Sequence, residues 1–260
     1  MAGRVRAACR CPRDAGRDRA LCGRCGSGGV MQPYLVFSLT ATLGAMGELA
    51  GHERRGSLSW PGRSSILGLF GAAMGIDRRG DFSALDALDL AVAVFDTGAP
   101  LRDYHTVQTV PSAAAKRPNS RPEALAAARG RTNTTITLRD YRAGVFYGVA
   151  AWGEGLEALA AALNRPYYTL YLGRKSCPLA APPGAKLVTA QSPEAALAHL
   201  TLPPWRSAGT ATARILICDA TGDDPVQEQV HDVPRDRALW HFAPRRVAVR
   251  DVTITMVGAP

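Results

Sequence analysis

Along much of this chain, the spacing of apolar and polar positions is typical of strands in some segments and of helices in others. Tyr34–Leu39, Leu90–Phe95 and Val145–Trp152 are short apolar segments of the length typical of strands. Residues 64–76 and 155–163 instead carry apolar side chains at helical spacing. The pattern therefore predicts a mixed fold in which strands and helices follow one another.

Small polar residues indicate where the predicted helices begin. Ser64 or Ser65 stands where an N-cap of the first helix is expected. A second helix is predicted from Ser83 to Asp89, with Ser83 as its cap and Asp86 at the place of a capping-box acid. Residues 40–61 contain several glycines and no clear period, so they are predicted to form a loop.

Two further segments, 101–110 and 132–141, look extended. The residues between them are rich in Ala, Pro and Arg and offer no core positions. Together they predict a long hairpin with a mobile, basic tip. With that hairpin set aside, the order is strand, helix, strand, strand, helix, strand. This is the βαββαβ order of the ferredoxin-like fold. The last of these strands lies between the helix at 155–163 and residue 185.

The predicted fold class is α+β. A ferredoxin-like domain covers 31–184, with an inserted β-hairpin at 101–141. Residues 185–260 are predicted to form a small, β-rich C-terminal subdomain with one short helix at 192–200, capped by Ser192. Residues 1–30 are Arg-rich and poor in apolar residues, and are expected to be disordered or a non-native extension.

The net charge of +9 is concentrated in two short segments. Residues 1–30 contribute +5 and residues 109–131 contribute +4, so the remainder of the chain is neutral. Such a distribution fits contact with a polyanion, although two solvated, solubilising segments would give the same totals. No apolar run approaches the ~18 residues of a membrane span, and the N-terminus lacks the apolar centre of a secretory signal. A cytoplasmic protein without membrane contact is expected.

Four of the six cysteines lie in the first 25 residues, as Cys9, Cys11, Cys22 and Cys25. Four thiolates can hold zinc. However, almost no apolar residues surround them, so an upstream extension translated from too early a start is the simpler interpretation. The expected protein has neither a metal nor another cofactor.

Three segments are candidates for ligand binding, and the first is the glycine-rich stretch 61–76. A helix N-terminus offers free N–H groups to a phosphate, and Arg63 and Ser64 stand at this one. The alternative is that Arg63 pairs with an acid and the glycines allow close helix packing.

The second candidate is Leu101-Arg-Asp-Tyr-His-Thr-Val107. In a strand, Arg102 and Tyr104 share one face, while Asp103 and His105 share the other. Arg and Tyr together suit single-stranded RNA. Asp103 with His105 could support acid–base catalysis, or form a structural cross-strand contact.

The third candidate is Tyr167-Tyr-Thr-Leu-Tyr-Leu-Gly-Arg-Lys-Ser-Cys-Pro178. Gly173 opens a turn that carries Arg174, Lys175 and Ser176, a set able to contact a phosphate. The first glycine that a P-loop requires is replaced by Tyr168, so nucleotide binding of that kind is excluded. An exposed basic turn without a ligand is the alternative.

In order and spacing, these three segments resemble the Cas-five (CasD) family of type I-E CRISPR Cascade, and "MQPYLVFSL" at 31–39 is similar to its opening strand. The resemblance implies a non-catalytic subunit that binds the 5′ handle of the guide crRNA and contacts the CasC backbone subunit, the CasA large subunit and other Cascade subunits. It also implies that the domain is RRM-like and of the RAMP class. The hairpin 101–141 would be a thumb that displaces the nucleotide between handle and spacer. The residues assigned to RNA binding are Arg63, Ser64, Arg102, Tyr104, His105, Arg139, Arg174, Lys175 and Ser176.

The family resemblance also supplies an alternative activity. Related type I-C subunits cut precursor crRNA without metal, using Tyr, Lys and His at one phosphate. The corresponding set here would be Tyr104, His105 and Lys175. Metal-independent endoribonuclease activity is therefore the second hypothesis.

Overall fold

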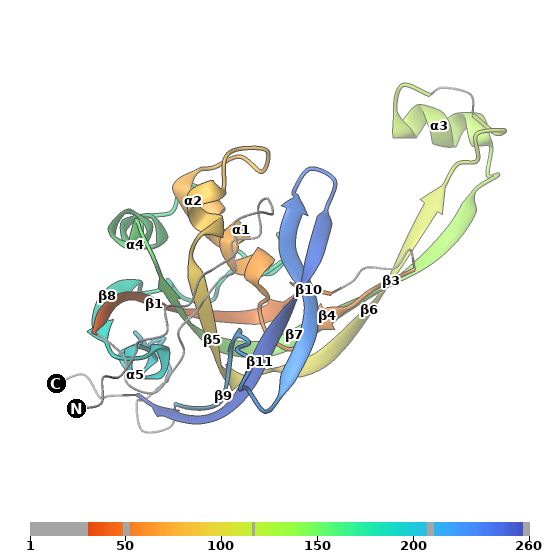
Figure 1. The fold of residues 1–260 in the computed structure, drawn as a ribbon. Helices are drawn as coiled ribbons and strands as arrows, with labels where there is room; N and C mark the ends of the chain where they lie inside the picture. The colour runs from red at the N-terminus through yellow and green to blue at the C-terminus, as the bar shows by residue number, and fades with distance from the viewer. Residues whose placement is uncertain (1–30, 49–52, 116–117, 207–210, 257–260) are drawn as a thin grey trace, which may run out of the picture.

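The computed structural model describes residues 31–48, 53–115, 118–206 and 211–256. Within these ranges nine strands form a single sheet, and two short strands pair separately. Figure 1 shows a body of sheet and helices from which a two-stranded ribbon projects, carrying a helix at its far end. The fold is mixed α/β and rich in sheet. The predictions for residues 1–30 lie outside the described residues.

The body contains the predicted order of strand, helix, strand, strand, helix, strand. Its four strands are neighbours in the order β5-β7-β1-β8, and every neighbouring pair is antiparallel. In chain order the elements are β1 (Gln32–Gly44), α1 (Arg63–Met74), β5 (Asp89–Asp96), β7 (Asn133–Trp152), α4 (Leu156–Asn164) and β8 (Lys186–Ala190).

Strand β1 is buried on both of its faces. Phe37 and Leu39 pack in the cluster that includes α1 and α4, whereas Tyr34 and Val36 pack in a second cluster with α5 (Pro193–Leu197). A strand covered on both sides needs apolar side chains at successive positions rather than at alternate ones. This explains why the segment has a continuous apolar run.

The projecting ribbon is continuous with the body. Its strands are β6 (Ala99–Thr109) and the first half of β7, which runs through into the sheet without a break. The prediction that the tip has no regular structure is wrong in part, because α3 (Arg121–Ala128) lies there. Ser120 caps α3 by accepting the N–H of Glu123, with proline in the first turn.

The C-terminal strands extend the same sheet rather than forming a separate layer. They are β9 (Thr212–Asp219), β10 (Gln227–Asp236) and β11 (His241–Thr255), and β9 pairs with β5 along Ala91–Val94. The fourth strand of the body is β8, so it lies beyond residue 185 and not before it. The boundary predicted at 184/185 therefore does not coincide with the edge of the sheet.

The short elements also differ from the predictions. Strand β1 continues to Gly44, and β2 (Met46–Gly47), β3 (Arg54–Arg55) and β4 (Ser57–Leu58) lie in the segment predicted as a loop. Helix α2 spans Ser83–Asp86. The predicted serine caps of α1 and α2 are wrong, since Gly62 and Phe82 occupy the cap positions and neither helix has a side-chain cap. No helix in the described part of the chain is long and apolar enough to span a bilayer.

Candidate nucleic-acid interface

The base of the ribbon is a three-stranded surface with two different faces. Strand β3 runs parallel to β7 on one side, and β6 runs antiparallel to it on the other. In this register Arg102 is opposite Asp140 and Tyr104 is opposite Leu138, while Asp103 is opposite Arg139. Because successive side chains in a strand point to opposite faces, these pairs separate into two sets.

We call the first set the Tyr104 face: Arg54, Arg102, Tyr104, Leu138 and Asp140. Asp140 accepts hydrogen bonds from Arg102 Nε at 2.7 Å and from Arg54 Nη2 at 2.8 Å. The hydrogen bond from Arg102 and the additional one from Arg54 lower the pKa of the Asp140 carboxyl, despite some burial. One carboxylate thus offsets much of the charge of two arginines. The Tyr104 ring beside them is 70% exposed.

We call the second set the Arg139 face: Arg55, His105, Arg139, Tyr141 and Arg174. The central carbon of the Arg174 guanidinium lies 4.5 Å from the centre of the Tyr141 ring, which is cation–π geometry. Arg139 Nε and Arg174 Nη1 are both buried and have no hydrogen-bond partner among the described residues. No ion pair joins Arg139 to Asp103 there, although the two are opposite in the register.

The turn that carries Arg174 is held tightly against the body. The Leu172 N–H donates to the Cys177 carbonyl at 2.8 Å, and the Cys177 N–H donates to the Arg174 carbonyl at 2.8 Å. Gly173 has φ of 87°, and a Cβ there would lie 1.7 Å from the Ala45 carbonyl oxygen, so only glycine fits. Lys175 and Ser176 are exposed on this fixed turn.

The prediction that Arg63 contacts a phosphate is wrong in this structure. Its side chain is 5% exposed, and Nη2 donates to the carbonyls of Asp86 and Leu88, both at 2.7 Å. Burial lowers the pKa of the guanidinium, but these carbonyls and nearby carboxylates keep it paired. Arg63 joins α1 to the segment that leads into β5.

The N-terminus of α1 is also occupied, by a carboxylate of the protein. Asp232 of β10 accepts the Arg63 backbone N–H at 2.6 Å and is 2% exposed. A Cβ at Gly62 would lie 2.9 Å from Asp232 Oδ2, so glycine permits this close approach. The predicted phosphate site at Arg63 and Ser64 is therefore filled by Asp232, since both would use the same helix N-terminus. Ser64 itself is half-buried.

The residues of the alternative nuclease site are not brought together. Tyr104 and His105 are adjacent in β6 and point to opposite faces, so they do not converge on one phosphate. The His105 side chain makes no hydrogen bond among the described residues. Its backbone carbonyl accepts Thr137 Oγ1 at 3.2 Å. The described residues contain no group of three His, Cys, Asp or Glu able to hold a metal. The zinc hypothesis for Cys9–Cys25 lies outside them.

The family model described as CRISPR-associated protein (Cas5) matches residues 34–248. The chain belongs to the CRISPR-associated Cas5 family. A curated Cas5 relative is "CRISPR system Cascade subunit CasD" of Escherichia coli (strain K12). It is 34% identical over 188 residues, covering 64% of this chain and 76% of the relative.

Solved structures agree with the Cas5 fold. A chain of a "CRISPR RNA-guided surveillance complex" has a TM-score of 0.64 at 24% identity, covering 85% of this chain and 91% of that one. A "Crystal structure of Cas protein" has a TM-score of 0.52, also at 24% identity, covering 87% and 99%.

Five residues of the two faces were not predicted from the sequence, and they are Arg54, Arg55, Leu138, Asp140 and Tyr141. Arg54 and Arg55 lie in a segment without clear period, and Tyr141 gave no signal beyond its place at the end of an extended stretch. The pairing of β3 with β7 brings Arg54 and Arg55 to the ribbon. The turn that carries Arg174 places its guanidinium over the Tyr141 ring. Neither contact is local in sequence, so only the folded structure reveals them.

Proposed function

We propose that this chain is the CasD-type subunit of a type I-E Cascade surveillance complex and that its Arg139 face binds the 5′ handle of the guide crRNA. We also assign the four-stranded body to the ferredoxin-like (RAMP) class. Family membership and the relationship to CasD of Escherichia coli support the first assignment. The strand order β5-β7-β1-β8 with α1 and α4 supports the second.

One observation carries the RNA assignment: the unpaired donors of Arg139 and Arg174. A buried cationic donor without a partner is costly, by about 1–3 kcal/mol or more. Arg174 stacks on Tyr141, and Arg139 lies two positions before Tyr141 on the same face of β7. A phosphodiester oxygen that reached these two guanidinium groups would pair with them and add negative charge to a face on which Arg55, Arg139 and Arg174 outnumber Asp103.

Each residue of the Arg139 face has a proposed role. Arg139 and Arg174 hold one phosphate, and Lys175 and Ser176 contact the next from the fixed turn. His105, exposed and two positions from Asp103 on the same face, contacts a base or the sugar-phosphate backbone. These contacts leave the base edges largely free, so binding by this face depends mainly on backbone shape and charge.

The Tyr104 face has a different proposed role. Its arginines are paired with Asp140, but the Tyr104 ring is open to solvent. We propose that Tyr104 stacks on the nucleotide displaced at the junction of handle and spacer, with Arg102 beside it. The two faces would then hold consecutive parts of the RNA on either side of the ribbon.

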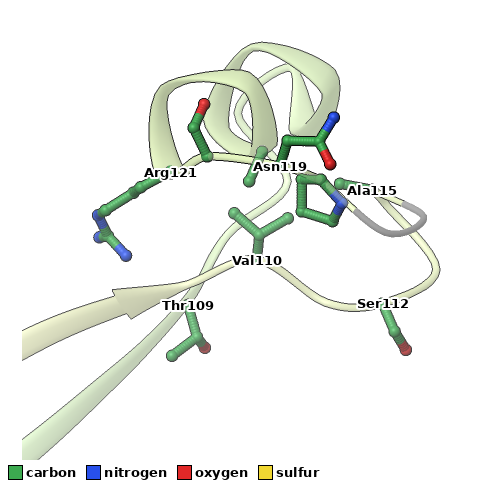
Figure 2. A pocket seen from close by; sticks show the side chains of 9 residues that line it. Thr109, Val110, Ser112, Ala115, Asn119 and Arg121 are labelled. Atoms are coloured by element: carbon green, nitrogen blue, oxygen red, sulfur yellow. The ribbon is translucent and has the colours of Figure 1, made fainter.

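The thumb tip is the proposed contact with the CasC backbone subunit, and CasA is proposed to pack against the body. A recess of about 620 Å³ lies between the end of the ribbon and α3. Figure 2 shows Val110 and Ala115 lining it with Thr109, Ser112 and Asn119, while Arg121 extends at its edge. A recess lined by small side chains suits a protein side chain better than a base.

We propose that the subunit does not cleave RNA. Repeat RNA incubated with the purified protein in EDTA should remain intact. Cleavage that disappears in His105→Ala would contradict this and favour the endoribonuclease alternative.

The RNA assignment can be tested with handle RNA titrated over a range of salt. For Arg139→Ala plus Arg174→Ala, affinity should fall, and the slope of log K against log salt should flatten by about 0.7 for each phosphate that the variant no longer neutralises. Charge reversal of Arg174 and Lys175 should have the same effect. Arg214→Ala is the matched control, since Arg214 is exposed on β9, away from the ribbon. An unchanged slope in both double variants would refute the site.

A further inference from the structure

Exposed aromatic and apolar side chains gather around the C-terminal end of α1. We call them the aromatic patch: Met74, Tyr167, Tyr168, Leu239 and Trp240. Their exposed fractions range from 42% at Met74 to 74% at Tyr167. Large apolar side chains clustered at a surface usually indicate a binding site. None of these residues belongs to either face of the ribbon.

The patch is built from three segments that are fixed to one another. The N–H groups of Tyr167 and Tyr168 donate to the carbonyls of Ala73 and Ala72, at 2.9 and 3.1 Å, which seats both tyrosines on the last turn of α1. Their rings meet edge to face, with centres 4.8 Å apart. The Tyr167 ring lies against Gly75, where a Cβ would approach it to 2.9 Å.

Arg78 connects the third segment, the turn between β10 and β11. Its guanidinium lies over the Trp240 ring, 3.1 Å from the ring centre, and its Nε donates to the Arg237 carbonyl at 2.6 Å. The Leu239 N–H donates to Asp236 Oδ1 at 2.9 Å. Figure 1 shows this turn on the body, beside the loop that follows α1 and far from α3 at the thumb tip.

Trp240 has a backbone conformation that is unfavourable for a large side chain. Its φ is 58°, in the left-handed region usually occupied by Gly or Asn. Nevertheless the ring is 65% exposed, so burial of the ring in the body does not offset the strain. Strain kept at an exposed aromatic side chain is a sign of a functional contact.

The charges around the patch argue against RNA as its occupant. Arg78 is engaged with Trp240 and the Arg237 carbonyl, and Arg237 pairs bidentately with Asp86 at 2.5 and 3.0 Å. The loop 77–81 contains two arginines and two aspartates, so its net charge is zero. Arg165, two positions before Tyr167, is exposed and adds one positive charge. A phosphate backbone would therefore find fewer cations here than on the Arg139 face and its turn. Tyr, Trp, Met and Arg are the residues enriched in protein–protein interfaces.

We propose that the aromatic patch is a docking surface for another protein subunit, one that offers apolar side chains and carries little net charge where it makes contact. The proposal goes beyond RNA binding and depends on the proposed function only for the set of subunits used in its test. Trp240 and Tyr167 would be the central contacts.

The test places the photo-crosslinker p-benzoylphenylalanine at position 240 of the full chain, assembled with its guide RNA and the co-expressed subunits. We expect an adduct with a protein subunit. The control is the same substitution at Trp205, another exposed tryptophan at 59%, which should give no comparable adduct. An adduct with RNA, an adduct between two copies of this chain, or no adduct would overturn the proposal.

A second variant measures how much the contact contributes. Trp240→Gly suits the positive φ, so the melting temperature should remain unchanged while the affinity for the subunit found in the adduct falls by about tenfold or more. Because the contact is apolar, this reduction should be similar at about 0.1 M and about 0.5 M salt. An unchanged affinity would overturn the proposal.

The two proposals fail separately. Trp240→Gly should leave the binding of handle RNA unchanged, and the Arg139 and Arg174 variants should retain the adduct at position 240. Loss of RNA binding alone would therefore bear only on the Arg139 face, and loss of the adduct only on the patch.

Discussion

At the scale of single residues, buried arginines determine more of the structure than the total charge suggests. Arg245 donates to Asp232 through Nε and Nη2, at 2.7 and 2.9 Å, and to Asp219 through Nη1 at 2.5 Å. Asp232 in turn accepts the backbone N–H of Arg63. This network joins β9, β10 and β11 to the start of α1. Arg63 and Arg245 are therefore structural, unlike the arginines of the Arg139 face.

Replacing Arg63 should destabilise the fold without changing RNA binding. Arg63→Met leaves the buried Leu88 carbonyl and the part-buried Asp86 carbonyl without this donor. We therefore expect a loss of about 3 kcal/mol in the free energy of unfolding, measured with urea. Arg79→Met, at an exposed arginine, is the control and should be near neutral. A flattened salt slope for handle RNA with unchanged stability would show that Arg63 contacts a phosphate after all.

Asp224 should make stability depend on acid pH. Its hydrogen bond from Arg250, with others from Thr221, lowers its pKa from 3.8 to about 2. A lowered pKa stabilises the fold above the unfolded value, and this stabilisation is lost as pH falls from about 4 towards 2.

Asp224→Asn should therefore cost about 1–2 kcal/mol at neutral pH and less at pH 3. Thermal unfolding at both pH values measures the difference. Asp223→Asn is the control at an exposed neighbour. An equal cost at both pH values would contradict the assignment.

At the scale of elements, strand register separates the chemistry of the ribbon into two faces. The sequence predicts Arg102, Tyr104 and Arg174 as contacts on one RNA-binding face. In the structure, the Arg174 guanidinium stacks on Tyr141, which points away from Arg102 and Tyr104. A single strand of RNA would have to pass around the ribbon edge or its end to meet both faces.

The Tyr104 face offers a test of this charge balance. Asp140→Ala should release Arg54 and Arg102, because the carboxylate that pairs both is removed. We expect tighter binding to handle RNA and a salt slope steeper by about 0.7. Asp251→Ala, an exposed aspartate on β11, is the control and should change neither. A slope unchanged by Asp140→Ala would place the RNA away from this face.

At the scale of the whole molecule, the C-terminal strands are part of one cooperative unit. Strand β9 pairs with β5 from Ala91 to Val94, and Val230 and Val247 belong to the same buried cluster as α1. Asp232 fixes the start of α1. Residues 31–184 alone would therefore lack the strand β9 that pairs with β5. They would also lack Asp232, which contacts the start of α1.

A chain that ends after residue 204 should consequently fail to fold. We expect no cooperative unfolding transition by circular dichroism, whereas the full chain should show one for its body. Replacing residues 110–132 by a short turn is the control, since it removes only the end of the ribbon and should keep the transition. A cooperative transition in the shortened chain would show that the body folds without β9, β10 and β11.

The sequence alone determined the order of strands and helices within the body, the positions of α1 and α4, the ribbon strands and the family. These features follow from local periodicity and from short motifs, which the chain carries within a few residues. Tertiary structure decided which strand became the fourth of the body, which basic residues are buried, and which face of the ribbon each one occupies. These outcomes depend on partners far apart in sequence, such as Asp232 with Arg63 and Arg174 with Tyr141. A buried charge takes its role from the partner that folding places beside it, and no local pattern records that partner.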